Sequence, residues 1–254
     1  MDGILSFTDQ DHFDSHWEDN YYESIPEMKL NAAERFLQPI LKDDASSNSL
    51  YLDAGCGDGV HLKVLNDVTP SREGNNVALD ISTSALLTAR KRDAKNWEFI
   101  HGDVGMLPFA SDSFDASFSF GVLAYTPDPK KSFSELVRVT KPGGKIGIWI
   151  YPKSGGLGGW VFGMVRGLCK LTGSIGTSLI SNMIVPVLGL LPTQSKLSLA
   201  NASWKQCKEV VLVNIAPEQL FFPEPEEIEA WFKDFNLEIT SNDKNNPIAI
   251  WGKK

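Results

Sequence analysis

The chain has 254 residues, of which 42% are hydrophobic and 22% are charged, the balance of a globular protein with a full core. Catalytic α/β folds commonly reach this length as one domain, so we expect a single domain with an insertion. The formal net charge of -8 argues against a broad electrostatic grip on nucleic acid, because phosphate binding needs clustered Lys and Arg.

Within the first 151 residues, an irregular N-terminal part is followed by predicted strands that alternate with predicted helices. Residues 1–30 are polar and aromatic, and we expect a loop and a short helix there. Apolar residues at helical spacing predict an amphipathic helix over 31–42. After a polar break, the pattern predicts strands at 50–54, 76–80, 97–103, 114–120 and 145–151. Helices are predicted between them at 60–66, 82–94, capped by Ser82, and 130–140, the last ended by Lys-Pro-Gly-Gly.

The pattern is interrupted after residue 151 and resumes near residue 224. A helix over 226–235 and strands over 237–241 and 248–252 complete the alternation. Strands alternating with helices imply βαβ units. We therefore expect an α/β fold with a mostly parallel, seven-stranded sheet and helices on both faces. The predicted regions are an arm and core over 1–151, a helical insertion over 152–222, and a final helix and strand pair over 223–254.

The strongest local signal is LDAGCGDG at residues 52–59. Glycines after a strand let the backbone turn tightly and approach a ligand without Cβ clashes. A dinucleotide site would need G-x-G-x-x-G, but Gly55 and Gly57 are followed by Gly59, and Val60 stands where the last glycine should be. A purely structural turn is the alternative interpretation.

Two acidic residues end the strands that follow. Asp80 could accept two hydrogen bonds from a ribose diol, and Asp103 could accept one from an exocyclic adenine amine. Either carboxylate could instead serve as an ordinary helix cap or turn residue. Because ligands of such sheets lie beyond the carboxyl ends of the strands, residues 55–59, Asp80, Asp103 and Phe120 are expected along one rim.

The order of these motifs resembles that of the class I, Rossmann-like S-adenosylmethionine-dependent methyltransferases over residues 49–151. The motifs are LDAGCGDG, ALDIS, HGDVGMLPFASDSFDASFSFGVLAYTPDP and LVRVTKPGGKIGIWIY. The resemblance implies a Rossmann-like fold and S-adenosylmethionine as the cofactor. The cofactor-binding residues that it implies are Asp53, Gly55, Cys56, Gly57, Asp80, Ile81, Asp103, Val104, Ser119, Phe120 and Gly121.

The same resemblance assigns roles along the cofactor. Asp53 and the neighbouring glycines would line its methionine end. Asp80 would hold the ribose hydroxyls, and Asp103 would meet the adenine amine, with Ile81 and Val104 against the ring. Residues 119–121 would close the wall near the sulfonium.

The chain departs from many relatives in the segment 122–129. Ala124 and Tyr125 stand where those proteins have a His pair, so a His that could act as a base is missing. Methyl transfer depends mainly on alignment and exclusion of water, and a base is needed only if the acceptor must lose a proton. The catalytic candidates are Tyr125 and His16, and ordinary packing is the alternative for Tyr125. His12 and His16 lack the further ligands of a metal site, so no metal is predicted.

The insertion resembles those that cover the active site in many small-molecule methyltransferases. Glycines at 155–159 could hinge it, and a rigid helical subdomain is the alternative. Its apolar character favours an acceptor with hydrophobic parts. The candidate acceptor-binding residues are Trp160, Trp204 and Phe221 of this insertion, together with Trp17 and Tyr21 of the N-terminal arm.

Compartment and partners follow from smaller signals. Three cysteines without a CxxC pair and an acidic N-terminus without signal-peptide regions indicate a cytoplasmic protein. Residues 171–195 carry no charge and approach the ~20 residues of a membrane span. Glycines and a proline interrupt them, so a buried or lid helix pair is favoured over peripheral membrane contact. We expect a monomer or homodimer.

The predicted function is methyl transfer to oxygen, nitrogen or carbon of a small, partly apolar molecule. Three alternatives stay open: a catalytically silent S-adenosylmethionine-binding protein, an NAD(P)-dependent oxidoreductase and a protein methyltransferase. The glycine spacing argues against the oxidoreductase.

Overall fold

The computed structural model describes residues 4–7, 27–41, 49–68, 76–92, 96–151, 163–165, 167–169, 171, 180, 182–183, 220–244 and 248–254. The chain divides into two compact units. One comprises Met1–Pro152 with Phe221–Lys254, and the other is Lys153–Leu220. The described residues of the second unit are short helical pieces, and the role of the insertion as a lid stays a prediction.

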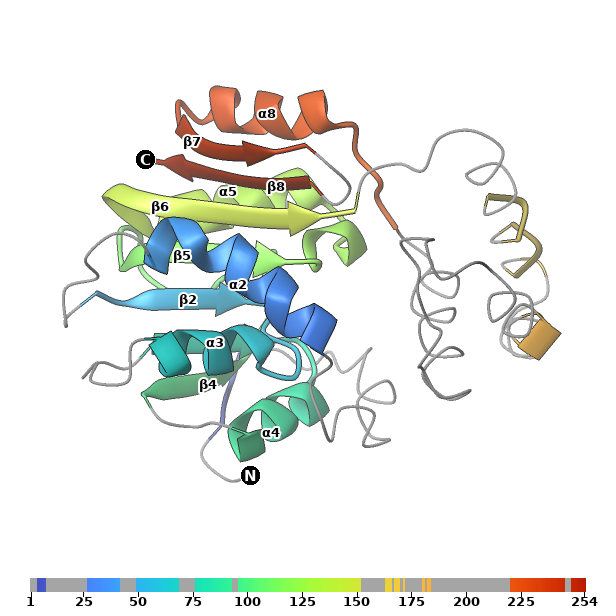
Figure 1. Cartoon of the computed structure of the whole chain (residues 1–254), viewed down its shortest axis with the longest axis horizontal. Coiled ribbons are helices and arrows are strands. Elements are labelled where there is room, and N and C mark those ends of the chain that lie inside the picture. Colours follow the sequence, from blue (N-terminus) through green and yellow to red (C-terminus); the bar gives the residue numbers. More distant parts are fainter. Residues whose placement is uncertain are drawn as a thin grey trace. The chain divides into compact units, whose positions relative to one another are not determined.

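An eight-stranded, mostly parallel sheet forms the centre of the first unit (Figure 1). Its strand order is β1-β4-β3-β2-β5-β6-β8-β7, and only β8 runs antiparallel to its two neighbours, β6 and β7. The strands are β1 Leu5–Ser6, β2 Tyr51–Ala54, β3 Asn76–Asp80, β4 Trp97–His101, β5 Phe114–Phe120, β6 Thr140–Ile150, β7 Glu238–Asp243 and β8 Ile248–Lys253. The α/β fold and all seven predicted strands are confirmed.

The prediction of seven strands is one short, because β1 adds an eighth at the edge of the sheet. Leu5 and Ser6 pair in parallel with Ile100 and His101 of β4. The Phe7 amide donates to the His101 carbonyl at 2.7 Å, and the Ser6 hydroxyl lies 2.8 Å from His101 Nδ1. A two-residue strand leaves no periodicity in the sequence, so the pattern showed only loop and helix there.

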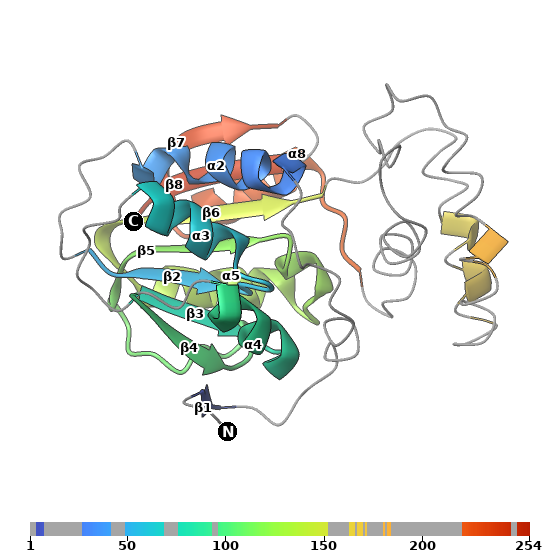
Figure 2. The ribbon, with the colours of Figure 1, turned by 60° about the horizontal axis from the view of Figure 1, so that its bottom comes forward.

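Helices cover both faces of the sheet. They are α2 Glu27–Leu41, α3 Val60–Val68, α4 Thr83–Arg92, the 3₁₀ turn η1 Leu123–Tyr125, α5 Pro129–Val139 and α8 Pro225–Asp234. The first three lie on one face, and α5 lies on the other (Figures 1 and 2). Phe133 of α5 packs on Phe232 of α8, with ring centroids 4.9 Å apart.

Local sequence explains where several elements begin and how strands lie. Ser82 caps α4 as predicted, since its hydroxyl accepts from the Ala85 amide at 3.2 Å. Asp128 caps α5 in the same way, with Pro129 following it. Every residue of β2 and β3 is buried, as expected for central parallel strands covered on both faces.

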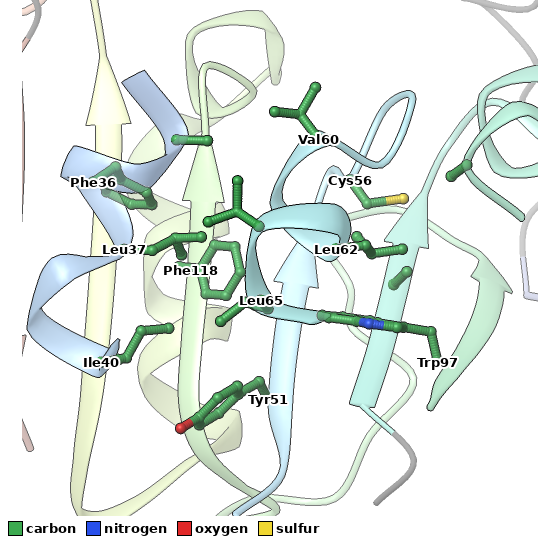
Figure 3. Close-up of a cluster of buried hydrophobic side chains, with 14 of the residues drawn as sticks. Phe36, Leu37, Ile40, Tyr51, Cys56, Val60, Leu62, Leu65, Trp97 and Phe118 are labelled. Carbon is green, nitrogen blue, oxygen red and sulfur yellow. The ribbon is translucent and has the colours of Figure 1, made fainter. Parts of the chain in front are cut away.

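A hydrophobic cluster joins α2 and α3 to the sheet (Figure 3). Side chains of Phe36, Leu37 and Ile40 point from α2 toward Phe118 of β5. The Trp251 indole donates to the Phe36 carbonyl at 2.7 Å and so ties the last strand to this helix. The cluster fixes β2 and α3, and with them the loop that joins the two.

Candidate active site

The loop between β2 and α3 has a backbone that its glycines make accessible. Gly55, Gly57 and Gly59 have φ angles of 91°, 52° and 81°, in the left-handed region where a Cβ is unfavourable. A Cβ on Gly55 would also lie 2.3 Å from the side chain of Val122. The Gly55 and Cys56 amides both donate to the Leu79 carbonyl, at 2.7 and 3.0 Å. The loop is therefore held against the end of β3.

Asp80 connects this glycine loop to the start of α4. One carboxylate oxygen accepts from the Gly57 amide at 2.8 Å, and the other accepts from the Ser82 amide at 2.9 Å. Burial raises the pKa of Asp80 to about 6, although these amides favour the charged form. A carboxylate offers about four acceptor positions, so acceptor capacity remains for the two ribose hydroxyls that the sequence predicts.

Asp103 lies on the next strand connection and is half-buried. Its Oδ1 accepts from the Gly105 amide at 2.7 Å, so it makes the turn that the alternative interpretation expects. The Gly102 amide donates to the Asp80 carbonyl at 2.9 Å and joins the two strand connections. Val104 is buried beside them. The turn leaves acceptor positions on Asp103 for an adenine amine.

Ile81 is half-buried directly after Asp80. Its carbonyl lies 3.0 Å from His101 Nε2. Because a carbonyl only accepts, Nε2 carries the hydrogen, and in a neutral ring Nδ1 then accepts from the Ser6 hydroxyl. The β1 strand is thereby linked to the residue predicted to pack on adenine.

The end of β5 and the residues just after it lie against the glycine loop, since the Val122 side chain lies nearest to a Cβ added at Gly55. Phe120 stacks on Trp149 with centroids 4.0 Å apart, and Gly121, at φ 73°, donates to the Trp149 carbonyl. Ser119 is wholly buried and its hydroxyl donates to the Ala54 carbonyl at 2.8 Å. Ser119 thus joins β5 to β2 through its side chain.

Cys56 has a structural place in the glycine loop. Its side chain is buried in the hydrophobic cluster (Figure 3). Burial raises the pKa of the Cys56 thiol well above its usual value, and the nearby carboxylates of Asp80 and Asp53 act in the same direction. The thiol is therefore neutral and unsuited to nucleophilic chemistry.

Two acceptor-site candidates come together at η1. Tyr125 is half-buried at the end of this turn, and its amide donates to the Val122 carbonyl at 2.9 Å. The Phe221 amide donates to the Ala124 carbonyl at 2.8 Å. The Phe221 ring stacks on Trp231 of α8, with centroids 5.7 Å apart. Phe221 thus belongs to the first unit and lies beside η1.

A further residue of the candidate site, His61, lies in the first turn of α3 and was not predicted from the sequence. Its Nδ1 is 3.2 Å from Oδ2 of Asp53, and the two side chains are only 7% and 0% exposed. Among the residues that the structure describes, Asp53 Oδ1 and His61 Nε2 have no hydrogen-bond partner. The only signal in the sequence was the spacing of eight residues between Asp53 and His61. This spacing crosses a loop and therefore follows neither the strand nor the helix period.

Five predicted site residues lie outside the described residues: His16, Trp17, Tyr21, Trp160 and Trp204. Their roles stay predictions. Within the described part of the chain, no three His, Cys, Asp or Glu side chains gather as a metal site. Among the same residues, no helix has the length and apolar character to cross a membrane.

The glycine loop, Asp80, Asp103 and residues 119–122 all lie at or just beyond the carboxyl ends of parallel strands in one sheet. This is the arrangement of a Rossmann-like nucleoside-binding site. Residues 52–148 match the family described as "Methyltransferase domain". The class I methyltransferase fold predicted from the motif order is confirmed.

Several known proteins similar to part of this chain are methyltransferases. A malonyl-[acyl-carrier protein] O-methyltransferase of Buchnera aphidicola is 40% identical over 100 residues, 39% of this chain and 38% of that protein. A demethylmenaquinone methyltransferase of Renibacterium salmoninarum is 51% identical over 71 residues, 28% of this chain and 29% of that protein. The chain thus matches well under half the length of these relatives.

A solved structure of low sequence identity shares the fold. Geranyl diphosphate C-methyltransferase of Streptomyces coelicolor, in complex with Mg²⁺, geranyl diphosphate and S-adenosyl-L-homocysteine, has a TM-score of 0.54 and 13% identity. The match covers 88% of this chain and 77% of that one. At this identity the likeness shows the fold alone.

Proposed function

We propose that this protein is an S-adenosylmethionine-dependent methyltransferase that acts on a small, partly apolar acceptor. The observation that carries the proposal is the position of Asp80 in a methyltransferase domain. This buried carboxylate joins the glycine loop to α4 and keeps acceptor positions at the place where a nucleoside ribose would lie.

The described residues fit the chemical groups of this cofactor. Asp80 and Asp103 offer acceptors to hydroxyl and amine donors, as a nucleoside requires. Asp53 Oδ1 is a buried acceptor with no hydrogen-bond partner among the described residues, which suits an ammonium group. The bound cofactor would supply a methyl carbon on a positively charged sulfur, a good leaving group.

The protein's own contribution would be alignment and exclusion of water. The stacked pair Phe120 and Trp149 gives the site an apolar wall. Tyr125 has a hydroxyl that could donate to the acceptor, and no histidine base is needed when the acceptor atom carries no proton that must leave. The inserted unit Lys153–Leu220, with its aromatic residues, would close over the acceptor in the cytoplasmic enzyme.

Two relatives indicate the kind of acceptor. One is named for malonyl-[acyl-carrier protein], methylated at oxygen, and the other for the quinone demethylmenaquinone. Of these two acceptors, the quinone agrees better with the apolar composition of the insertion. The alternatives are a silent cofactor-binding protein, an NAD(P)-dependent oxidoreductase and a protein methyltransferase.

Calorimetric titration with S-adenosylhomocysteine tests the cofactor. We expect micromolar binding, about -8 kcal/mol, and a loss of about tenfold or more in Asp80→Ala, because a charged hydrogen-bond acceptor is removed. NADH is the control ligand. Tighter binding of NADH, or no binding of S-adenosylhomocysteine, would refute the proposal.

Turnover tests the enzyme against the silent alternative. Release of S-adenosylhomocysteine is measured with a panel of quinone, acyl-thioester and phenolic acceptors. Activity with any of them, reduced in Tyr125→Phe through kcat, supports catalysis with that hydroxyl at the acceptor. Cofactor binding without turnover across the panel favours the silent protein.

A further inference from the structure

Three buried carboxylates, Asp53, Asp58 and Asp80, belong to the glycine loop and to the strand ends beside it, and they differ in their partners. Asp80 accepts from two backbone amides. Asp58 Oδ2 has no hydrogen bond within the described part of the chain but forms an ion pair with the Arg92 guanidinium at 3.3 Å. Asp53 is wholly buried, and among the described residues its Oδ2 contacts the His61 ring while its Oδ1 has neither a hydrogen bond nor a cation.

An unpartnered carboxylate oxygen in a buried site is costly, because a charged group loses its water without compensation. Asp53 stands two residues before Gly55, at the end of β2, where it pairs with Ala78 and Phe118 of the neighbouring strands. A donor, best a cation, is therefore expected to reach Oδ1 when the site is occupied. The ammonium of an amino-acid group supplies three N–H donors and a positive charge.

His61 is built to hold Asp53 in one orientation. An ionised carboxylate is acceptor-only, so the hydrogen between them belongs to Nδ1 of the ring. The ring is itself fixed by Phe120, Phe118 and Phe36, with centroid distances of 4.6, 5.8 and 6.3 Å. Its place in the first turn of α3 comes directly after the glycine loop.

We propose that His61 is a positioning residue that fixes Asp53 so that Oδ1 accepts from the ammonium at the methionine end of the cofactor. The inference rests on the proposed function, since it needs a cofactor with an amino-acid end. His61 acts through Asp53 and makes no contact with the reacting atoms.

The test compares two ligands that differ at the methionine end. S-adenosylhomocysteine carries the ammonium, whereas 5′-methylthioadenosine has the same nucleoside and thioether without it. Affinities are measured by calorimetry for the whole chain, for Asp53→Asn and for two matched variants of His61. His61→Phe keeps a ring of similar shape without a donor, and His61→Asn keeps an N–H donor without the ring.

We expect His61→Phe to weaken S-adenosylhomocysteine by about tenfold or more, the usual scale for a charge-assisted hydrogen bond. Its affinity for 5′-methylthioadenosine should stay within about twofold. His61→Asn should restore most of the lost affinity. The double variant Asp53→Asn, His61→Phe should bind no more weakly than Asp53→Asn, because both changes remove the same interaction.

Equal losses for both ligands in His61→Phe would show a merely structural role and overturn the proposal. Unchanged affinity for S-adenosylhomocysteine, or additive losses in the double variant, would overturn it as well. A parent protein that binds neither ligand would instead refute the proposed function. Thermal unfolding of each variant checks that the fold is retained.

Discussion

The two ends of the candidate cofactor site are held in different ways. At the nucleoside end, Asp80 and Asp103 accept from backbone amides. At the proposed methionine end, Asp53 is held by the His61 side chain, and within the described part of the chain Asp53 Oδ1 and His61 Nε2 have no hydrogen-bond partner. Backbone donors are fixed by the loop itself, whereas the pair depends on a single histidine. The first end is therefore preorganised, and the second needs its ligand for completion.

The largest expected effect comes from the loop that both ends share. In Gly55→Val, a β-branched residue at φ 91° would also meet Val122 at 2.3 Å. Strain and overpacking together should cost on the order of 3 kcal/mol in the free energy of unfolding. Both S-adenosylhomocysteine and 5′-methylthioadenosine should lose affinity, as measured by denaturant unfolding and calorimetry.

The matched control is Gly163→Ala, since nothing lies within 4 Å of the added Cβ and alanine favours a helix over glycine. It should leave stability and affinity unchanged or improved. If Gly55→Val bound only S-adenosylhomocysteine poorly, the loop would serve one end rather than both.

The next effect uses the ionisation of Asp80. Burial raises its pKa from 3.8 to about 6, which corresponds to about 3 kcal/mol of cost for the charged form in the folded state. The folded protein thus binds this proton more tightly than the unfolded chain. This contribution to stability therefore rises as the pH falls from about 6 to about 4.

Cofactor affinity should change in the opposite direction over the same range. Ribose hydroxyls donate to the ionised carboxylate, so the affinity for both ligands should fall by up to about tenfold for each pH unit below about 6. Asp80→Asn, which does not titrate, is the reference in both measurements. Parallel changes in stability and affinity, or identical profiles in the two proteins, would contradict the assignment of Asp80.

The sequence predicted the positions of the site residues better than it predicted their hydrogen-bond partners. The spacing of Asp80 and Asp103 after parallel strands placed both at the common rim. The amides that bind Asp80 could not be predicted, because their directions depend on the loop's positive φ angles. The hydroxyl of Ser119 points to the Ala54 carbonyl, and its neighbour across the sheet is 65 residues away in sequence.

The same limit explains the two features that were missed. The His61–Asp53 contact spans a strand end, a loop and a helix start, so neither a strand nor a helix period relates them. Strand β1 has two residues, and its pairing with β4 depends on a partner about 95 residues further along the chain. The periodicity of apolar residues shows which face of a long helix or strand is buried. It does not predict these contacts, because they are made at the ends of elements.

The smallest expected effect tests whether strand β1, through Ser6 and His101, stabilises the nucleoside end of the candidate site. The hydroxyl of Ser6 meets His101, whose other nitrogen donates to the Ile81 carbonyl. Ser6→Ala removes the part-buried hydrogen bond to His101, so thermal unfolding should show a loss of about 1 kcal/mol. Because the link leads to the adenine side, both ligands should weaken by the same small factor, about threefold or less. A loss confined to S-adenosylhomocysteine would instead connect β1 to the methionine end and remove the distinction between the two ends.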